Sequence, residues 1–174
     1  MHEFTELIYR CTSFSLDSLN RANDEIIKEM ESSSETILVK NLQMINLHRA
    51  ILAVGMFSIF EAHLQDNLNC ENGFSEAKKI LNQAGEKDIQ ECFNYLILAV
   101  NVLKHGRGRS YDELLKRSNQ LPFRVKLQDE YVFDEGDVSE ISTLVEVNDA
   151  FVELCSKSIE EVSNVVRQTH PNFY

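Results

Sequence analysis

Apolar residues that recur at three- and four-residue steps over long stretches constrain this chain more than any other feature of its sequence. The longest such stretch covers about residues 34–69, and its spacing is that of one face of an α-helix. Its core positions are predicted to be Leu38, Leu42, Ile45, Leu52, Met56, Ile59 and Phe60. The whole chain has only two prolines and six glycines, so little interrupts helices of this length. A long helix is stabilised mainly by packing its apolar face, as in the wall of a bundle.

Five further helices follow from the same periodicity. They are expected at about residues 3–31, 75–83, 88–105, 110–117 and 148–169. The helix at about 88–105 is apolar nearly all round and is therefore predicted to be central. The core face of the first helix is predicted to hold Phe4, Leu7, Ile8, Cys11, Phe14, Leu19, Ala22, Ile26 and Met30. The length of 174 residues suits one domain, residues 1–174: a mainly α, up-and-down helical bundle of about four long helices plus short ones.

A short alternating segment follows Pro122 and departs from the helical pattern. Its apolar positions, separated by polar or charged ones, are Phe123, Val125, Leu127, Tyr131 and Phe133. Alternation of this kind is typical of a strand, and the acidic, glycine-containing run 134–137 is typical of a turn. The sequence therefore predicts a small extended or β-hairpin insertion near residues 123–145.

Charge is distributed unevenly along the chain. The net charge of −11 argues against general binding to nucleic acid or to a membrane surface. Residues 104–126 nevertheless hold seven basic side chains against two acidic ones, whereas residues 128–161 hold eleven acidic side chains and one lysine. Because salt screens such fields within about 10 Å at ~0.1 M, the basic segment can still attract an anion locally.

No known cofactor, metal or secretion motif is present. The four cysteines are scattered, without a C-x-x-C pair, and are predicted to be reduced, buried thiols: Cys11, Cys70, Cys92 and Cys155. The sequence has no P-loop, dinucleotide-binding or H-E-x-x-H motif, so no cofactor and no metal are expected. The N-terminus lacks the features of a signal peptide, and the longest uncharged apolar run, 50–60, is shorter than the ~20 residues of a membrane span. We expect a cytoplasmic protein.

The junction after the helix at about 88–105 is the strongest candidate for a chemical site. Asn101 and His105 are four positions apart and so share one helical face. The basic residues beside them are Lys104, Arg107 and Arg109. An imidazole can move a proton near neutral pH and cations stabilise a crowded phosphate, so this group suits acid–base chemistry on a phosphodiester. The same residues also fit plain helix termination, with glycines at the end and cations against the dipole.

Two short motifs and the helix pattern together resemble a known family. The motifs are Phe57-Ser-Ile-Phe60-Glu61 in the long second helix and Asn101-x-x-Lys104-His105-Gly106 at the end of a late helix. With about four long helices, they resemble uncharacterised bacterial members of the HEPN superfamily over most of the chain. The family motif is arginine, four to six residues, then histidine, often with a polar residue directly after the arginine.

The resemblance implies a function for the junction. His105 matches the family histidine and Asn101 the polar residue, whereas the arginine position falls on Val100, Ala99 or Leu98 for four, five or six intervening residues. Many members are metal-independent ribonucleases of toxin–antitoxin, phage-defence or CRISPR-linked systems, and they dimerise with two motifs facing each other. The resemblance thus implies His105 as general acid or base and Asn101 as the residue that orients phosphate or ribose. Phosphate contacts are implied for Lys104, Arg107 and Arg109.

The implied partners are RNA, a second copy of the chain and a cognate antitoxin or other protein. A different class of function also fits the sequence. In that alternative the junction only caps helices, and the acidic segment 128–161 docks a basic partner protein. The chain would then be a non-catalytic interaction module.

Overall fold

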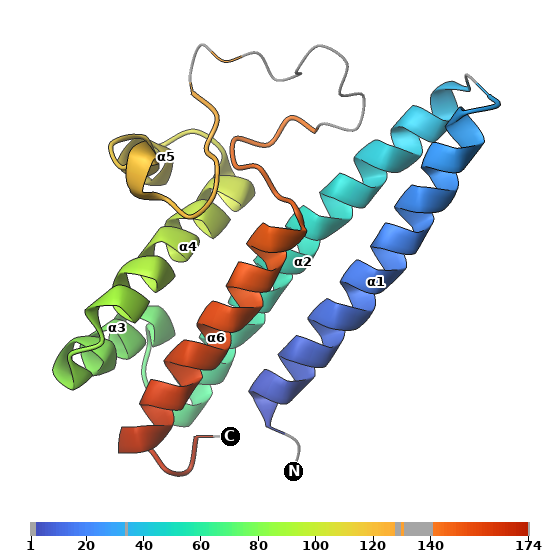
Figure 1. The fold of residues 1–174 in the computed structure, drawn as a ribbon. Helices are drawn as coiled ribbons and strands as arrows, with labels where there is room; N and C mark the ends of the chain where they lie inside the picture. Colours follow the sequence, from blue (N-terminus) through green and yellow to red (C-terminus); the bar gives the residue numbers. More distant parts are fainter. Residues whose placement is uncertain (1–2, 34, 128–129, 131–140, 174) are drawn as a thin grey trace.

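Six α-helices and one short 3₁₀ helix form the regular structure of the computed structural model, which describes residues 3–33, 35–127, 130 and 141–173. The α-helices are α1 (Phe4–Met30), α2 (Thr36–Leu68), α3 (Gly73–Ala84), α4 (Lys87–His105), α5 (Arg109–Leu115) and α6 (Asp149–Thr169). The 3₁₀ helix spans Ser118–Gln120. Each α-helix end lies within two residues of its predicted position, so the mainly helical bundle is confirmed (Figure 1).

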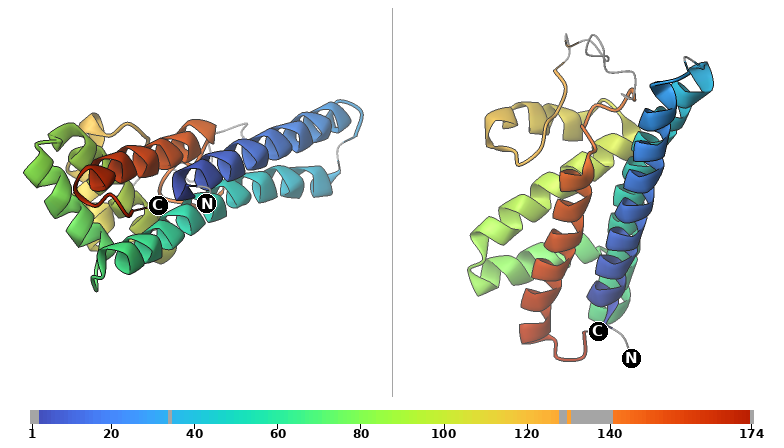
Figure 2. Two further views of the ribbon diagram at one scale, coloured as in Figure 1. Left: turned by 90° about the horizontal axis from the view of Figure 1, so that it is seen from below. Right: turned by 45° about the vertical axis from the view of Figure 1, so that its right-hand side comes forward.

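The helices pack in two groups that share α2 and α6. α1 and α2 form a long antiparallel hairpin, and α6 lies against both of them (Figure 1). On the other side, α3 and α4 pack against each other and against α2 and α6, while α5 crosses the end of α4 (Figure 2). The far tip of the α1–α2 hairpin extends beyond the other helices.

An aromatic cluster joins α2, α3 and α4. The side chains of Phe57 and Phe60 in α2 meet Phe74 in α3 and Phe93 in α4, with ring centroids 5.4 to 6.5 Å apart. Edge-to-face and tilted pairs at these separations add about 0.5–1.5 kcal/mol each beyond burial of their area. Phe57, Phe60 and Phe93 are fully buried. The cluster therefore fixes how the three helices converge.

The core face predicted for α1 is wrong in part. Phe14 is 75% exposed and Leu7 is 53% exposed, whereas the buried positions of this helix are Thr5, Ile8, Thr12 and Leu16. Thr12 donates a hydrogen bond from Oγ1 to Met56 Sδ at 3.1 Å. Because α1 packs mainly against α2 and α6, its buried strip is narrow, and two threonines complete it. Apolar periodicity alone does not identify such positions.

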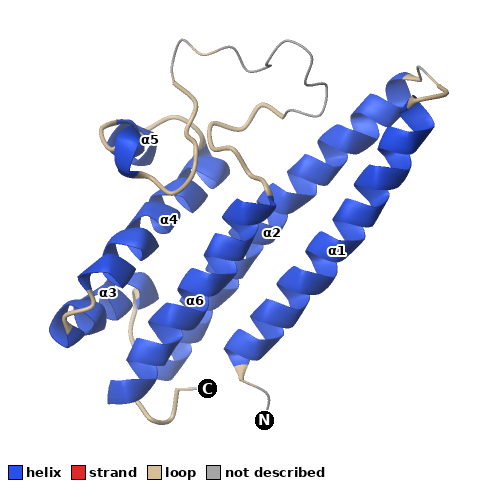
Figure 3. Cartoon of the chain, viewed as in Figure 1, coloured by secondary structure: helices blue, strands red, loops and turns tan. Residues whose placement is uncertain are grey.

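Among the described residues of 123–145, the predicted β-hairpin is not found. The backbones of its two described ends meet in one isolated antiparallel bridge between Val125 and Val145, with hydrogen bonds from the N–H of Lys126 to the carbonyl of Leu144 and from the N–H of Glu146 to the carbonyl of Arg124. No strand is drawn among the described residues (Figure 3). The alternating apolar side chains anchor the segment to the core instead: Val125 is buried, and Phe123 packs edge-on against Phe151 at 5.2 Å. The predicted strand positions Tyr131 and Phe133 lie outside the described residues.

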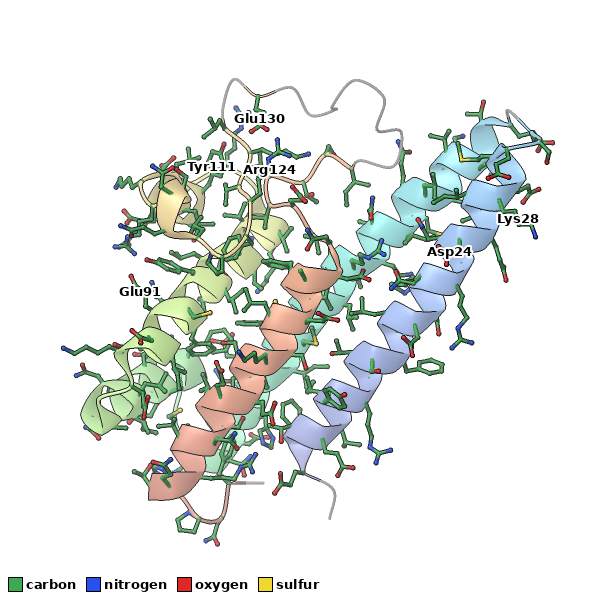
Figure 4. The ribbon with its side chains drawn as sticks, viewed as in Figure 1. Asp24, Lys28, Glu91, Tyr111, Arg124 and Glu130 are labelled. Carbon is green, nitrogen blue, oxygen red and sulfur yellow. The ribbon has the colours of Figure 1, made fainter. Side chains whose placement is uncertain are left out.

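Residues 123–127 are also anchored to α5. Tyr111 in α5 is buried and donates a hydrogen bond from its hydroxyl to the backbone oxygen of Lys126 at 2.6 Å. Arg124 forms ion pairs with Glu130 and Glu146 on the outside of the same region (Figure 4). The Tyr111 hydrogen bond and the backbone bonds of the Val125–Val145 bridge therefore hold residues 123–127 together.

The cysteine prediction is corrected at three positions. Cys155 is fully buried, but Cys11 is exposed and Cys70 and Cys92 are half-buried. Cys11, like Phe14, lies on the outer face of α1, because the buried strip of this helix is narrow. All four are free thiols.

The outer face of α2 is an exposed apolar stripe. Its members are Ile37, Met44, Leu47, Ile51 and Ile59, each about half exposed, so the predicted core position of Ile59 is wrong. At 3.6 residues per turn these positions fall within about 120° of one another on the helix. Gly55 lies in the middle of the stripe, with no atom within 4 Å of where its Cβ would be. No described part of the chain covers this face.

Among the described helices, α2 is also the one that is long and apolar enough to cross a membrane by length and composition. In its most apolar window 39% of the residues are buried inside the protein. Ala53, Phe57 and Phe60 of this helix are fully buried in the bundle core. The composition of α2 is thus accounted for in part by its central position.

Candidate functional site

The predicted site residues occupy the last turn of α4 and the turn after it. Gly106 ends the helix: its φ of 73° is readily adopted only by glycine, and its N–H donates to the carbonyl of Val102 at 2.8 Å. Lys104 and His105 form the last turn, where cations face the negative end of the helix dipole. Gly106 therefore ends α4, as the alternative reading of this stretch predicts. The side chains of Lys104 and His105 are exposed and not used in ending the helix.

His105 is exposed at the helix end. Its ring makes no hydrogen bond, ion pair or ring contact with any described residue. Asn101, one turn earlier on the same face, is half-buried. A histidine held by its own bundle would be unavailable for proton transfer, and His105 is not held in that way.

Arg107 and Arg109 lie on the α5 side of the junction, and both are exposed. The charge of Arg107 acts on Tyr111, whose pKa is nevertheless raised because burial disfavours its ionised form. The pKa of Glu113 is lowered, first by its hydrogen bond with Lys116 and to a lesser degree by the charges of Arg117 and Arg109. Both arginines lie close enough to α5 for their charges to act on its ionisable side chains.

A polar cleft opens beside this face of α4, between α2, α3 and α4; we call it the α2–α4 cleft. Its volume is about 200 Å³. Its polar lining is Ser58, Glu61, Asn72, Lys78, Asn101 and Lys104. Its apolar lining is Phe57, Phe74, Ile97 and Val100. Of the predicted site residues, the structure brings Asn101 and Lys104 together here, whereas His105, Arg107 and Arg109 lie outside the lining.

Backbone packing fixes the cleft. Gly73 at the start of α3 lies so close to α2 that a Cβ would be 2.7 Å from the carbonyl oxygen of Glu61 and 2.7 Å from the Cβ of Leu64. Asn72 caps α3 by accepting a hydrogen bond from the N–H of Ser75 at 2.8 Å. The first turn of α3 is therefore held directly against Glu61.

Val100 occupies the first of the positions where the family motif would have its arginine. Its side chain is 4% exposed and lines the α2–α4 cleft. Ala99, the second such position, is fully buried in the core. A cation in this cleft therefore comes from Lys78 or Lys104 and not from α4 positions 99 or 100.

Sequence reasoning missed Ser58, Glu61 and Lys78 as members of a site. The sequence does show that the lining residues of each helix share one face. They are 57, 58 and 61 in α2, 74 and 78 in α3, and 97, 101 and 104 in α4. That these three faces meet is a property of the tertiary packing. Local periodicity does not contain it.

The remaining histidines have other environments. His63 lies between aromatic rings, with centroids 4.2 Å from Phe4 and 4.9 Å from Phe173, and belongs to the packing of the lower end of the bundle. His48 is exposed on α2. No group of three or more histidine, cysteine, aspartate or glutamate side chains among the described residues could hold a metal ion.

A larger groove of about 650 Å³ runs between α1 and α6, on a different side of the molecule. Tyr9, Leu16 and Leu154 supply apolar lining. Its carboxylates are Asp17, Asp149, Glu153 and Glu160, and Lys157 is its one cation. Three of these carboxylates, Asp149, Glu153 and Glu160, belong to the acidic segment 128–161.

No protein-family model, no curated protein and no solved structure matched the chain.

Proposed function

We propose that this protein is a HEPN-like helical bundle that binds RNA and acts as a divergent, metal-independent ribonuclease of a bacterial toxin or defence system. The observation that carries the proposal is the state of His105, which is exposed and without a bonding partner among the described residues, one turn from Asn101. A cytoplasmic location goes with this function.

Metal-independent cleavage of RNA requires proton transfer and stabilisation of negative charge on the phosphate. When RNA is cleaved without a metal, the 2′-oxygen bonds to the adjacent phosphorus and the bond from phosphorus to the 5′-oxygen breaks. One group takes the proton of the 2′-hydroxyl, and another gives a proton to the departing 5′-oxygen. His105 fills one of these roles, and Asn101 orients phosphate or ribose. Lys104, with Arg107 and Arg109 on the loop side, stabilises the anionic phosphate.

A homodimer completes the proposal. The uncovered stripe of α2 is a surface that a second copy can bury, and its residues are Ile37, Met44, Leu47, Ile51 and Ile59. Exposed apolar side chains gathered on one helix face in this way are characteristic of interaction sites. In such a dimer two copies of His105 provide the acid and the base.

The direct test of this function uses total RNA in the presence of a chelator. Wild-type protein is expected to cleave it, and the His105→Ala variant is expected not to. His170→Ala is the matched control, because His170 is also exposed but lies at the end of α6. Absence of cleavage by folded wild-type protein under all conditions would remove the enzymatic part of the proposal.

A second candidate function has its own supporting observation, the acidic groove between α1 and α6. Asp17, Glu153 and Glu160 make no ion pair with any described residue, so their charge is available to a basic partner protein. In this function the protein is an interaction module and His105 is not needed. Capture of a defined basic, amphipathic peptide by wild-type protein, weakened in a Glu153→Lys and Glu160→Lys double variant, would support it.

A further inference from the structure

The charged groups of the α2–α4 cleft are not paired with one another. Glu61 in α2, Lys78 in α3 and Lys104 in α4 all line it, yet none of the three makes a side-chain ion pair or hydrogen bond with another described residue. Elsewhere in the chain, adjacent opposite charges do pair, as in Lys79–Glu76 at 2.7 Å and Lys116–Glu113 at 2.8 Å. The lining of the cleft thus contains two lysines and one glutamate whose charges no described side chain neutralises.

The charge of the α2–α4 cleft indicates which kind of ligand it binds. The cleft has a local surplus of one positive charge, although the whole chain has a net charge of −11. Two ammonium groups from different helices suit a phosphate, and a carboxylate accepts hydrogen bonds from hydroxyl groups. A volume of about 200 Å³ lies below the roughly 300 Å³ of pockets for drug-sized ligands. It fits a phosphate with its sugar better than a whole nucleotide.

We propose that the α2–α4 cleft binds one phosphate and the adjoining ribose of an RNA strand, with Lys78 and Lys104 on the phosphate and Glu61 accepting a hydrogen bond from the 2′-hydroxyl. This inference rests on the proposed RNA-binding function and adds Glu61 and Lys78 to its site. The 2′-hydroxyl is the group by which a protein distinguishes RNA from DNA. Glu61 is therefore a specificity residue, and Lys78 is a phosphate-binding residue.

The assignment of Lys78 is tested by the salt dependence of binding. Affinities of the full-length protein for a labelled single-stranded RNA are measured over a series of salt concentrations. The His105→Ala background keeps the strand intact. Lys78→Met is expected to weaken binding and to reduce the slope of log K against log salt by about 0.7, the value for one phosphate contact on a single strand. Lys79→Met is the matched control, because Lys79 is the next residue of α3 but is exposed and paired with Glu76. Equal slopes for the two variants would overturn the assignment.

The assignment of Glu61 is tested with RNA and DNA of the same sequence. Glu61→Ala is expected to reduce RNA affinity by about 5-fold, the factor for loss of one hydrogen bond of about 1 kcal/mol. Its affinity for DNA is expected to stay equal or to rise, because a carboxylate near the phosphate is removed. Glu61→Gln keeps an acceptor oxygen and is expected to retain the preference for RNA. If wild-type protein binds both strands equally, or if both variants lose the preference, Glu61 does not read the 2′-hydroxyl.

The outcomes also separate this inference from the function on which it rests. RNA binding with equal behaviour of Lys78→Met and Lys79→Met contradicts the cleft and leaves the proposed function standing. Failure of folded protein to bind RNA at all contradicts both. Circular dichroism and thermal unfolding show whether each variant is folded, which is expected because none of the three substituted side chains is buried.

Discussion

Arg49 in the middle of α2 donates a hydrogen bond from Nε to Oδ1 of Asp149, the first residue of α6, at 2.6 Å. Asn20 of α1 closes the group, because it accepts from Arg49 Nη2 at 2.9 Å and donates to Asp149 Oδ2 at 2.6 Å. The Arg49 side chain is only 10% exposed. One polar cluster therefore holds together the α1–α2 hairpin and the start of α6.

Removal of the carboxylate from this cluster should destabilise the protein. Asp149→Ala leaves a nearly buried guanidinium without its charged partner, and we expect a loss of about 2 kcal/mol in the free energy of unfolding. Urea denaturation followed by circular dichroism measures it. Glu153→Ala, one turn further along α6 at an exposed position, serves as the control and should change stability by less than about 0.5 kcal/mol. Equal effects of the two variants would contradict a stabilising role for the cluster.

Loss of the Tyr111 hydroxyl should loosen residues 123–127. Tyr111→Phe keeps the buried ring but leaves the carbonyl of Lys126 without its donor, which should cost about 1 kcal/mol of stability. Limited digestion with trypsin should then cleave faster after Lys126, which is buried in the wild-type protein. Tyr9→Phe, at an exposed position of α1, is the control. An unchanged digestion rate in Tyr111→Phe would show that the bond is not the anchor.

The four thiols should react in an order set by exposure and by pKa. Burial raises the pKa of Cys155 strongly, and burial together with the charge of Glu161 raises the pKa of Cys92. A raised pKa reduces the thiolate fraction, and the thiolate is the reactive form. Alkylation at pH 8 followed by mass spectrometry should therefore modify exposed Cys11 first and Cys155 last. Early modification of Cys155 in the folded protein would contradict its buried position.

A charge placed in the α2 stripe should prevent self-association. Ile51 is 59% exposed and lies near the centre of the stripe, so Ile51→Glu would bury a carboxylate in the proposed dimer interface. Sedimentation equilibrium should give a dimer for wild-type protein and a monomer for the variant. Phe14→Glu, which changes an even more exposed apolar residue on α1, should remain dimeric. A monomeric wild-type protein at high concentration would contradict this interface.

Periodicity predicted the helices well because each helix is a local structure. The three- and four-residue spacing of apolar side chains over 88–105, ended by Gly106, contains nearly all that determines α4. The buried face of α1 was predicted less well, because Thr5 and Thr12 complete it and a pattern of apolar residues does not include them. The alternation at 123–127 reflects anchoring by Val125 and Phe123 in the core, which a single segment cannot distinguish from a strand.

Only part of the candidate site could be predicted from the sequence. His105, Asn101 and Lys104 are close in sequence, so one helix end identifies them. Glu61 and Lys78 join Asn101 and Lys104 only because Gly73 allows α3 to lie against α2 at Glu61. Such a convergence of three helices depends on packing and is not visible in any one segment.

His105 is proposed to move a proton during RNA cleavage. The most direct test of this role follows a defined, end-labelled RNA oligonucleotide in excess chelator and identifies the ends of the products. Wild-type protein and His170→Ala should produce a 2′,3′-cyclic phosphate and a 5′-hydroxyl, and His105→Ala should be slower by at least about 100-fold, the range of general acid–base catalysis. Cleavage by His105→Ala at the wild-type rate, or no cleavage by folded wild-type protein, would contradict the account.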